Sequence, residues 1–176
     1  MKRIVAVLLL CLASQVSAQA PQAKTPATLK SIALQGLRET HNEKNWFVSG
    51  KEALQGLTPE QAAWSDGKNH SVGQLAQHLI FWNQQMLSQF KGVKPPKAPE
   101  NDETFKFDPK NWNSVVKQYD EVMTELEKVV EAASDADVQK MAPGAARIAQ
   151  HNAYHLGEIV MVRKAQGAWN PDTGVK

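Results

Sequence analysis

Apolar side chains recur every three or four residues along four separate stretches of this chain, and this period constrains the fold more than any other feature. Such a repeat gathers apolar residues on one face of an α-helix, whereas a half-buried strand would need strict alternation. No alternating stretch bounded by turn residues and no internal repeat is visible. The sequence therefore predicts an all-α protein. The four helices are expected over 27–57, with an interruption near Gly50 left open, then from Ser71 to Gly92, over 108–133 and over 145–166.

Local signals mark where some of these helices begin. Ser71 and Gln74 have the spacing of a capping box, in which each side chain bonds the backbone of the other residue. Thr58 and Gln61 form a second such pair, with Pro59 at the first helical position. We therefore expect a short additional helix after Thr58 and a long one after Ser71.

Two proline-containing segments interrupt the helical pattern. Ala142-Pro143-Gly144 is interpreted as a break just before the last helix. Val93–Asp108 contains three prolines among polar residues, so it cannot be helical throughout and is expected to be a long connection. Four helices with one long crossover between the second and the third predict a four-helix bundle.

The first part of the chain is typical of an export signal. Residues 1–18 combine two basic residues, an apolar run and a small-residue pattern that ends at Ala18. A lipoprotein interpretation of Cys11 is disfavoured by the large residue before it, and the run is shorter than the ~20 residues of a membrane span. We expect cleavage after Ala18, a flexible leader over 19–26, one folded domain over 27–176, and a periplasmic or secreted location.

Charge and cysteine content exclude several classes of function. The signal segment holds two of the 20 basic residues and none of the 18 acidic ones, so the rest of the chain is formally neutral. A neutral chain without a basic stripe has little support for binding nucleic acid or a membrane surface. Cys11 is the only cysteine, so after cleavage no disulfide or thiolate ligand is available. Any metal ion must be held by His, Asp or Glu.

Three of the five histidines lie on predicted apolar faces. His151 and His155 stand four residues apart in the last helix, so their imidazoles project from one face, which is also its apolar face. His78 lies on the apolar face of the second helix. The alternative is that these residues only fill the core, although two adjacent buried imidazoles without a cation or acceptor are costly to desolvate. His41 and His70 have no partners by spacing and are predicted to be surface residues.

Three segments carry a resemblance to a known family. The sequences SVGQLAQHL at 71–79, HNAYHLGEI at 151–159 and LQGLTPEQ at 54–61 resemble the DinB-like (DinB/YfiT) superfamily of small metal-binding helical bundles. In such proteins one histidine of the second helix and a pair spaced by four in the last helix bind a divalent ion, with positions left for water or substrate. The resemblance implies that His78, His151 and His155 are metal ligands.

Glu158 is the candidate catalytic residue. It follows His155 by three positions, close to the same face, where it could orient a ligand or accept a proton from bound water. The alternative is an intrahelical pair with Arg163. Imidazole ligands suit zinc, nickel, copper and iron alike, and manganese also stays open, so the identity of the divalent metal ion is not predicted.

The expected activity follows from the resemblance and from the ligand set. Three neutral imidazoles with open positions could polarise a substrate or activate a bound water or thiol. DinB-like proteins include thiol-dependent transferases and isomerases, and others are described only as metal-dependent hydrolases. Export disfavours the thiol branch, because reducing thiols are kept mainly inside cells. We expect a metal-dependent enzyme for a small-molecule substrate, with a non-catalytic metal-binding or ligand-binding module as the alternative and homodimer formation left open.

Overall fold

The computed structural model describes residues 26–173, so the predicted signal segment, its cleavage site and almost all of the leader lie outside the described residues. The described part of the chain is helical and contains no strand, which confirms the all-α prediction. No helix in this part is long and apolar enough to cross a membrane. The long helices are α1 (Leu29–His41), α4 (Val72–Phe90), α5 (Trp112–Ala132) and α6 (Asp135–Ala165), and the short ones are α2 (Gly50–Leu54), α3 (Pro59–Ala63) and the 3₁₀ helices η1 (Asn101–Phe105), η2 (Pro109–Asn111) and η3 (Pro171–Thr173).

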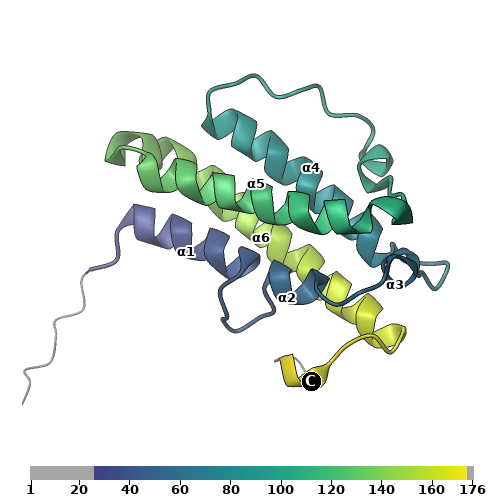
Figure 1. The fold of residues 1–176 in the computed structure, drawn as a ribbon. Coiled ribbons are helices and arrows are strands. Elements are labelled where there is room, and N and C mark those ends of the chain that lie inside the picture. Colours follow the sequence, from purple (N-terminus) through teal and green to yellow (C-terminus); the bar gives the residue numbers. More distant parts are fainter. Residues whose placement is uncertain (1–25, 174–176) are drawn as a thin grey trace, which may run out of the picture.

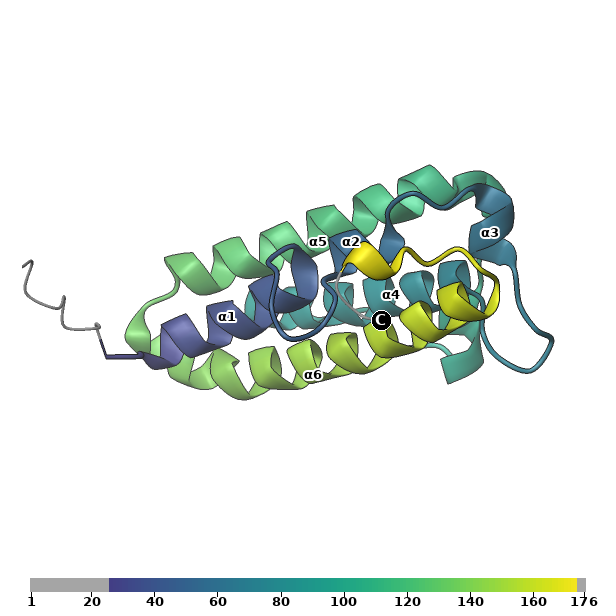
Figure 2. The same cartoon turned by 90° about the horizontal axis from the view of Figure 1, so that it is seen from below.

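The four long helices pack as a bundle. Helix α1 packs against α5 and α6, and α4 packs against the same two helices. Figures 1 and 2 show this arrangement from two directions, with α1 and α4 on opposite sides of the pair formed by α5 and α6. The connection from α4 to α5 passes back along the length of the bundle, so these two helices run in the same direction (Figure 1). The predicted bundle with one long crossover is confirmed.

The predicted helix starts are also confirmed. Ser71 accepts a hydrogen bond from the backbone of Gln74, and the Gln74 side chain accepts one from the backbone of Ser71, at the start of α4. Thr58 and Gln61 make the same pair of bonds at the start of α3. Each box satisfies backbone N–H groups that a helix start leaves without an intrahelical partner.

The predicted first helix over 27–57 is not continuous: α2 covers Gly50–Leu54, but the chain already leaves the helical conformation after His41. Helix α1 ends there, where the backbone N–H groups of Asn42 and Glu43 both donate to the carbonyl of Arg38. The next four residues, 42–45, are polar and mostly exposed, so the apolar pattern is not continuous. Trp46, in the loop before α2, is 98 % exposed.

The last helix begins earlier than predicted. Helix α6 starts at Asp135, after Ser134 has capped it, and it continues through Pro143. The proline removes one backbone donor, but its ring is exposed, and Val138 and Ala145 on either side of it are buried in the core. Packing on both sides therefore outweighs the breaking effect of proline.

A buried pair of asparagines sets the position of α6 along α4. Asn83 on α4 donates to the side-chain oxygen of Asn152 at 2.9 Å, and Asn152 donates back to that of Asn83 at 3.0 Å. Both residues are 0 % exposed. Two amides that satisfy each other inside a core disfavour any other register, because each shifted register would leave buried polar groups without partners.

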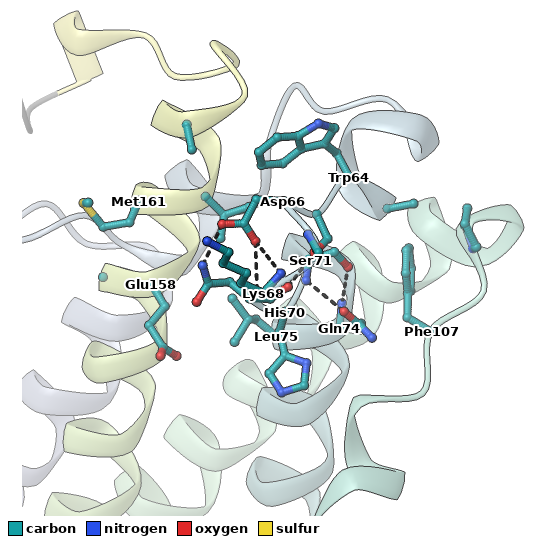
Figure 3. Close-up of a pocket in the computed structure, with 18 residues that line it drawn as sticks. Trp64, Asp66, Lys68, His70, Ser71, Gln74, Leu75, Phe107, Glu158 and Met161 are labelled. Carbon is teal, nitrogen blue, oxygen red and sulfur yellow. Dashed lines mark hydrogen bonds between the residues drawn. The ribbon is translucent and has the colours of Figure 1, made fainter.

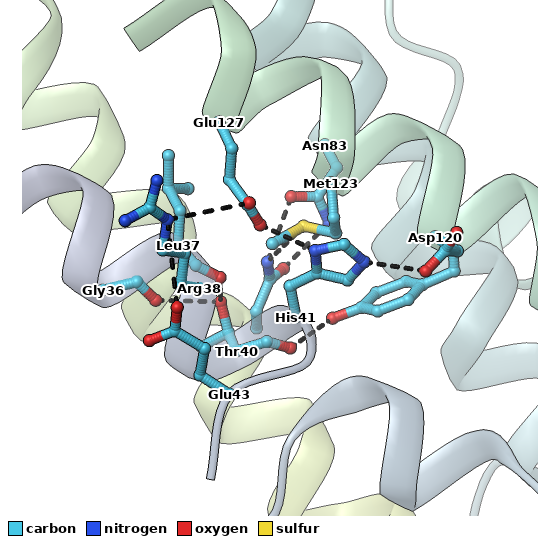
Figure 4. A network of polar contacts seen from close by, with 12 residues as sticks. Gly36, Leu37, Arg38, Thr40, His41, Glu43, Asn83, Asp120, Met123 and Glu127 are labelled. Atoms are coloured by element: carbon cyan, nitrogen blue, oxygen red, sulfur yellow. Dashed lines mark hydrogen bonds and ion pairs between the residues drawn. The ribbon is translucent and has the colours of Figure 1, made fainter. Parts of the chain in front are cut away.

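His41 is buried rather than on the surface, so the prediction for this residue is wrong. Its side chain is 2 % exposed, with Nδ1 2.6 Å from Glu127 and Nε2 3.0 Å from Asp120 (Figure 4). Burial by itself lowers the pKa of His41, but the hydrogen bonds and charges of Glu127 and Asp120 outweigh it, and the pKa lies above the ordinary value. With a carboxylate on each ring nitrogen, the imidazolium form joins α1 to α5.

Candidate metal centre

The three predicted metal ligands come together inside the bundle. His78 is presented by α4, while His151 and His155 are one turn apart on α6. One nitrogen from each ring lies within 4.8 Å of one nitrogen from each of the other two. The Nε2 atoms of His78 and His151 are 3.2 Å apart. The sequence pattern therefore identified a real cluster, assembled from two helices that pack against each other.

The environment keeps two of these rings neutral. Burial and, in decreasing order, the neighbouring His155, His151 and His70 together lower the pKa of His78 to about 3. Burial and His155 likewise lower the pKa of His151 to about 4, against an opposing effect of Glu158. A neutral imidazole has a free lone pair on one nitrogen, which is the form that binds a metal ion.

The donor set fits a divalent cation. Two nitrogens bound to one tetrahedral zinc ion at ~2.05 Å would lie about 3.3 Å apart, close to the separation of the His78 and His151 Nε2 atoms. Three neutral imidazoles are a common ligand set for a metal site that keeps a position for water or substrate. The cluster can therefore hold a metal ion, while the ligand type leaves its identity undecided.

Glu158 contacts the cluster through His155. Its Oε2 atom accepts a hydrogen bond from His155 Nδ1 at 2.6 Å, which leaves the Nε2 atom of that ring for a metal ion. The alternative pairing with Arg163 is wrong. The guanidinium of Arg163 donates instead to the carbonyl oxygens of Ala53 at 2.6 Å and Ala168 at 2.9 Å.

Tyr154 is an additional neighbour that the sequence analysis missed. It lies on the exposed side of α6, and its ring meets that of His155 edge to face, with the centroids 4.9 Å apart. The negative charge of Glu158 and a hydrogen bond to it raise the pKa of Tyr154. Tyr154 and His155 therefore both contact the Glu158 carboxylate. The sequence signal for this group is its spacing on one helix, because Glu158 follows His155 by three positions and Tyr154 by four.

A cavity of about 1140 Å³ lies beside the cluster, between α6, the start of α4 and the loop that follows α3 (Figure 3). The three histidine ligands do not line it, but Glu158 and His70 do. Its apolar lining includes Trp64, Leu75 and Phe107. Glu158 therefore connects the cavity directly to a ligand of the candidate metal centre.

His70 lies closer to the site than its predicted surface position implied. It is exposed, as predicted, yet its ring stacks on Phe105 with the centroids 3.9 Å apart. Phe105 in turn stacks on His78 at 4.0 Å with an interplanar angle of 9°. The Phe105 ring thus lies between the exposed imidazole that lines the cavity and the buried imidazole of the cluster.

Two substitutions of Glu158 are expected to show whether its hydrogen bond to His155 contributes to metal affinity. A Glu158→Gln variant keeps an oxygen that can accept the His155 Nδ1–H bond, so it should keep its metal affinity. Glu158→Ala removes the acceptor and should lower that affinity about 10- to 100-fold, as other losses of a ligand's hydrogen-bond partner do. Titration with a competing chromophoric chelator measures both constants. Equal affinity in all three proteins would show that Glu158 does not support the ligand.

Comparison with known protein families gives one match. The sequence profile of the DinB superfamily matches residues 51–159, which include His78, His151 and His155. Neither the curated proteins nor the solved structures contain a match to this chain.

Proposed function

Because this chain belongs to the DinB superfamily, we propose that it is an exported metalloenzyme that binds one divalent ion and acts on a small molecule. The observation that carries the proposal is the position of Glu158, which contacts His155 of the three-histidine cluster and also lines the cavity of about 1140 Å³. A carboxylate that supports a ligand is common in metal sites of every kind, but a site that only stored metal would not need a cavity of this size beside it.

The residues of the chain have separable tasks in this proposal. His78, His151 and His155 would hold the ion, which when bound supplies Lewis acidity and lowers the pKa of a coordinated water. Glu158 orients His155 and accepts a proton within the cavity. Trp64, Leu75 and Phe107 surround the apolar part of the substrate and exclude water from it.

Hydrolysis is the reaction type that we favour over thiol transfer. The predicted export places the protein away from the reducing thiols of the cell, whereas water is available everywhere. A screen of small esters, amides and phosphoesters against the protein loaded with zinc, nickel, iron or manganese tests this. Thiol-dependent turnover without hydrolysis would contradict the assignment, and a metal-loaded protein without exchangeable water would favour the non-catalytic alternative.

Gly157 offers a direct test of the cavity. It lines the cavity, and a Cβ added there would have no heavy atom within 4 Å. Gly157→Ala should therefore stabilise α6 by about 0.5–1 kcal/mol and keep activity. Gly157→Leu should place a side chain in the part of the cavity next to Glu158, keep metal affinity and raise KM about tenfold. Chemical denaturation, metal titration and steady-state kinetics check the three quantities. Unchanged kinetics in Gly157→Leu would show that substrate does not use this cavity.

Export itself is open to a simple measurement. We propose that the cell removes residues 1–18, because the charged, apolar and small-residue regions occur in the order of a signal peptide. The intact mass of the protein from its native compartment should correspond to a chain that begins at Gln19. A species that still carries Met1, or one with lipid on Cys11, would contradict this proposal.

A further inference from the structure

The long crossover connection contributes residues to the candidate metal centre. Its 3₁₀ helix η1 packs against α4, so the connection does more than join two helices. Two consecutive residues of η1, Thr104 and Phe105, contact the same ring, that of His78. Both are buried, at 4 % and 7 % exposure. We propose that Thr104 is a positioning residue that determines which nitrogen of His78 faces the metal ion.

The hydrogen bonds of Thr104 define the protonation of His78. Thr104 Oγ1 lies 2.6 Å from the carbonyl oxygen of Asn101 and 2.6 Å from His78 Nδ1. A carbonyl oxygen can only accept, so the single hydroxyl proton of Thr104 is donated to Asn101. The hydroxyl oxygen must then accept from His78, which places the proton of that ring on Nδ1. The Nε2 atom keeps its lone pair and faces His151.

The opposite arrangement would disable the site. If Thr104 donated to His78 Nδ1, the proton of that ring would lie on Nε2. The only ring nitrogen with a lone pair, Nδ1, would then face Thr104 instead of the other ligands. Asn101 and Thr104 are three residues apart in a 3₁₀ turn, so their bond is local and does not depend on the rest of the bundle. The turn thus acts as a fixed acceptor for His78.

Phe105 restrains the rotation of the His78 ring, whereas Thr104 determines its tautomer. The two rings are 4.0 Å apart and nearly parallel, and His70 stacks on the far side of Phe105. For His155 the corresponding hydrogen bond comes from Glu158 on its own helix, and among the described residues His151 Nδ1 has no partner. The α4 ligand is therefore the one that the crossover positions.

The test compares Thr104→Val, which removes the hydroxyl at nearly constant volume, with Thr104→Ser, which keeps it. ¹⁵N NMR of the metal-free protein at neutral pH, with His78 assigned by its loss in His78→Gln, should show the Nδ1–H form in the unaltered protein and in Thr104→Ser. Thr104→Val should populate the Nε2–H form. The metal affinity of Thr104→Val should fall about 10- to 100-fold, whereas Thr104→Ser should keep the affinity of the unaltered protein.

The outcomes separate this inference from the proposed function on which it rests. An Nδ1–H ring with unchanged metal affinity in a folded Thr104→Val would overturn the role of Thr104. A Thr104-dependent tautomer in a protein that binds no zinc, nickel, iron or manganese would support the role of Thr104 and contradict the proposed metalloenzyme. Circular dichroism shows whether each variant is folded. If Thr104→Val does not fold, the Thr104→Ser variant decides the test alone, because a change of the His78 tautomer in that variant would overturn the inference.

Discussion

Replacing any one of His78, His151 and His155 with Ala is expected to lower metal affinity by at least about 100-fold. Loss of a ligand's hydrogen-bond partner already lowers affinity about 10- to 100-fold, and loss of the ligand itself removes a bond to the ion. Each of the three contributes one nitrogen to a group within 4.8 Å. Metal content after dialysis, measured by mass spectrometry, and competition with a chromophoric chelator give the effect.

The control for this experiment must lie on the same helix and away from the cluster. His41→Ala is unsuitable, because His41 is buried between two carboxylates. Gln150→Ala is better matched, since Gln150 is exposed on α6 next to His151. It should keep one ion per chain. If His78→Ala also keeps one ion per chain, the α4 ligand is wrong, and the site must be rebuilt around His151 and His155.

Removing the buried imidazole of His41 is the second change with a large expected effect. His41→Leu leaves Glu127, whose side chain is only 16 % exposed, without its closest partner. Because Glu127 would keep only the 3.9 Å contact with Arg38 among the described residues, this change should lower the free energy of unfolding by about 2–3 kcal/mol. This is less than the roughly 3–5 kcal/mol of a fully uncompensated buried charge. For a domain of this size the midpoint of thermal unfolding would fall by roughly 5–10 °C. Calorimetry at pH 6 measures the difference.

The same histidine makes stability depend on pH. The pKa of His41 is raised in the folded protein, so the folded state binds the proton more tightly than the unfolded chain does. Its contribution is complete below the ordinary value of 6.5 and is lost as the pH rises through the folded value. The gap between the unaltered protein and His41→Leu should therefore shrink at alkaline pH.

The double variant His41→Leu/Glu127→Leu completes this test. If the lower free energy of unfolding of His41→Leu arises from the carboxylate that has lost its partner, removing Glu127 as well should recover part of the lost stability. Arg38, which is 3.9 Å from Glu127, and Asp120 remain in the double variant, so the recovery is expected to be incomplete. A double variant less stable than the sum of the two single effects would contradict a direct His41–Glu127 interaction.

The bundle and the cluster could be predicted from the sequence because both depend on the spacing of residues that are close together in the chain. The capping box at Ser71 and the pair of histidines four apart depend on positions within one helix turn. The helix break predicted at Pro143 is wrong for a related reason. Its breaking effect is local, whereas the packing that keeps α6 continuous involves other helices.

Unlike Tyr154, two of the residues that could not be predicted from the sequence make their contacts over long separations. His41 meets Glu127 86 positions later in the chain, so no spacing rule could identify the pair. Thr104 lies in a proline-rich connection without a periodic pattern, 26 positions after His78. Such contacts become visible only once the packing of helices and connections is known.

The reciprocal amide pair between α4 and α6 has a consequence for how the protein would acquire the proposed metal ion. Asn152 is the neighbour of His151 in the chain, and Asn83 is five residues beyond His78, so one register satisfies the amides and brings the histidines together. A slip of one turn would move α6 by about 5.4 Å and separate both pairs. Folding of the bundle would therefore bring the ligands together before the proposed ion binds. Binding should be a fast, single-step capture whose rate does not depend on refolding, and stopped-flow mixing with zinc would show one phase proportional to zinc concentration.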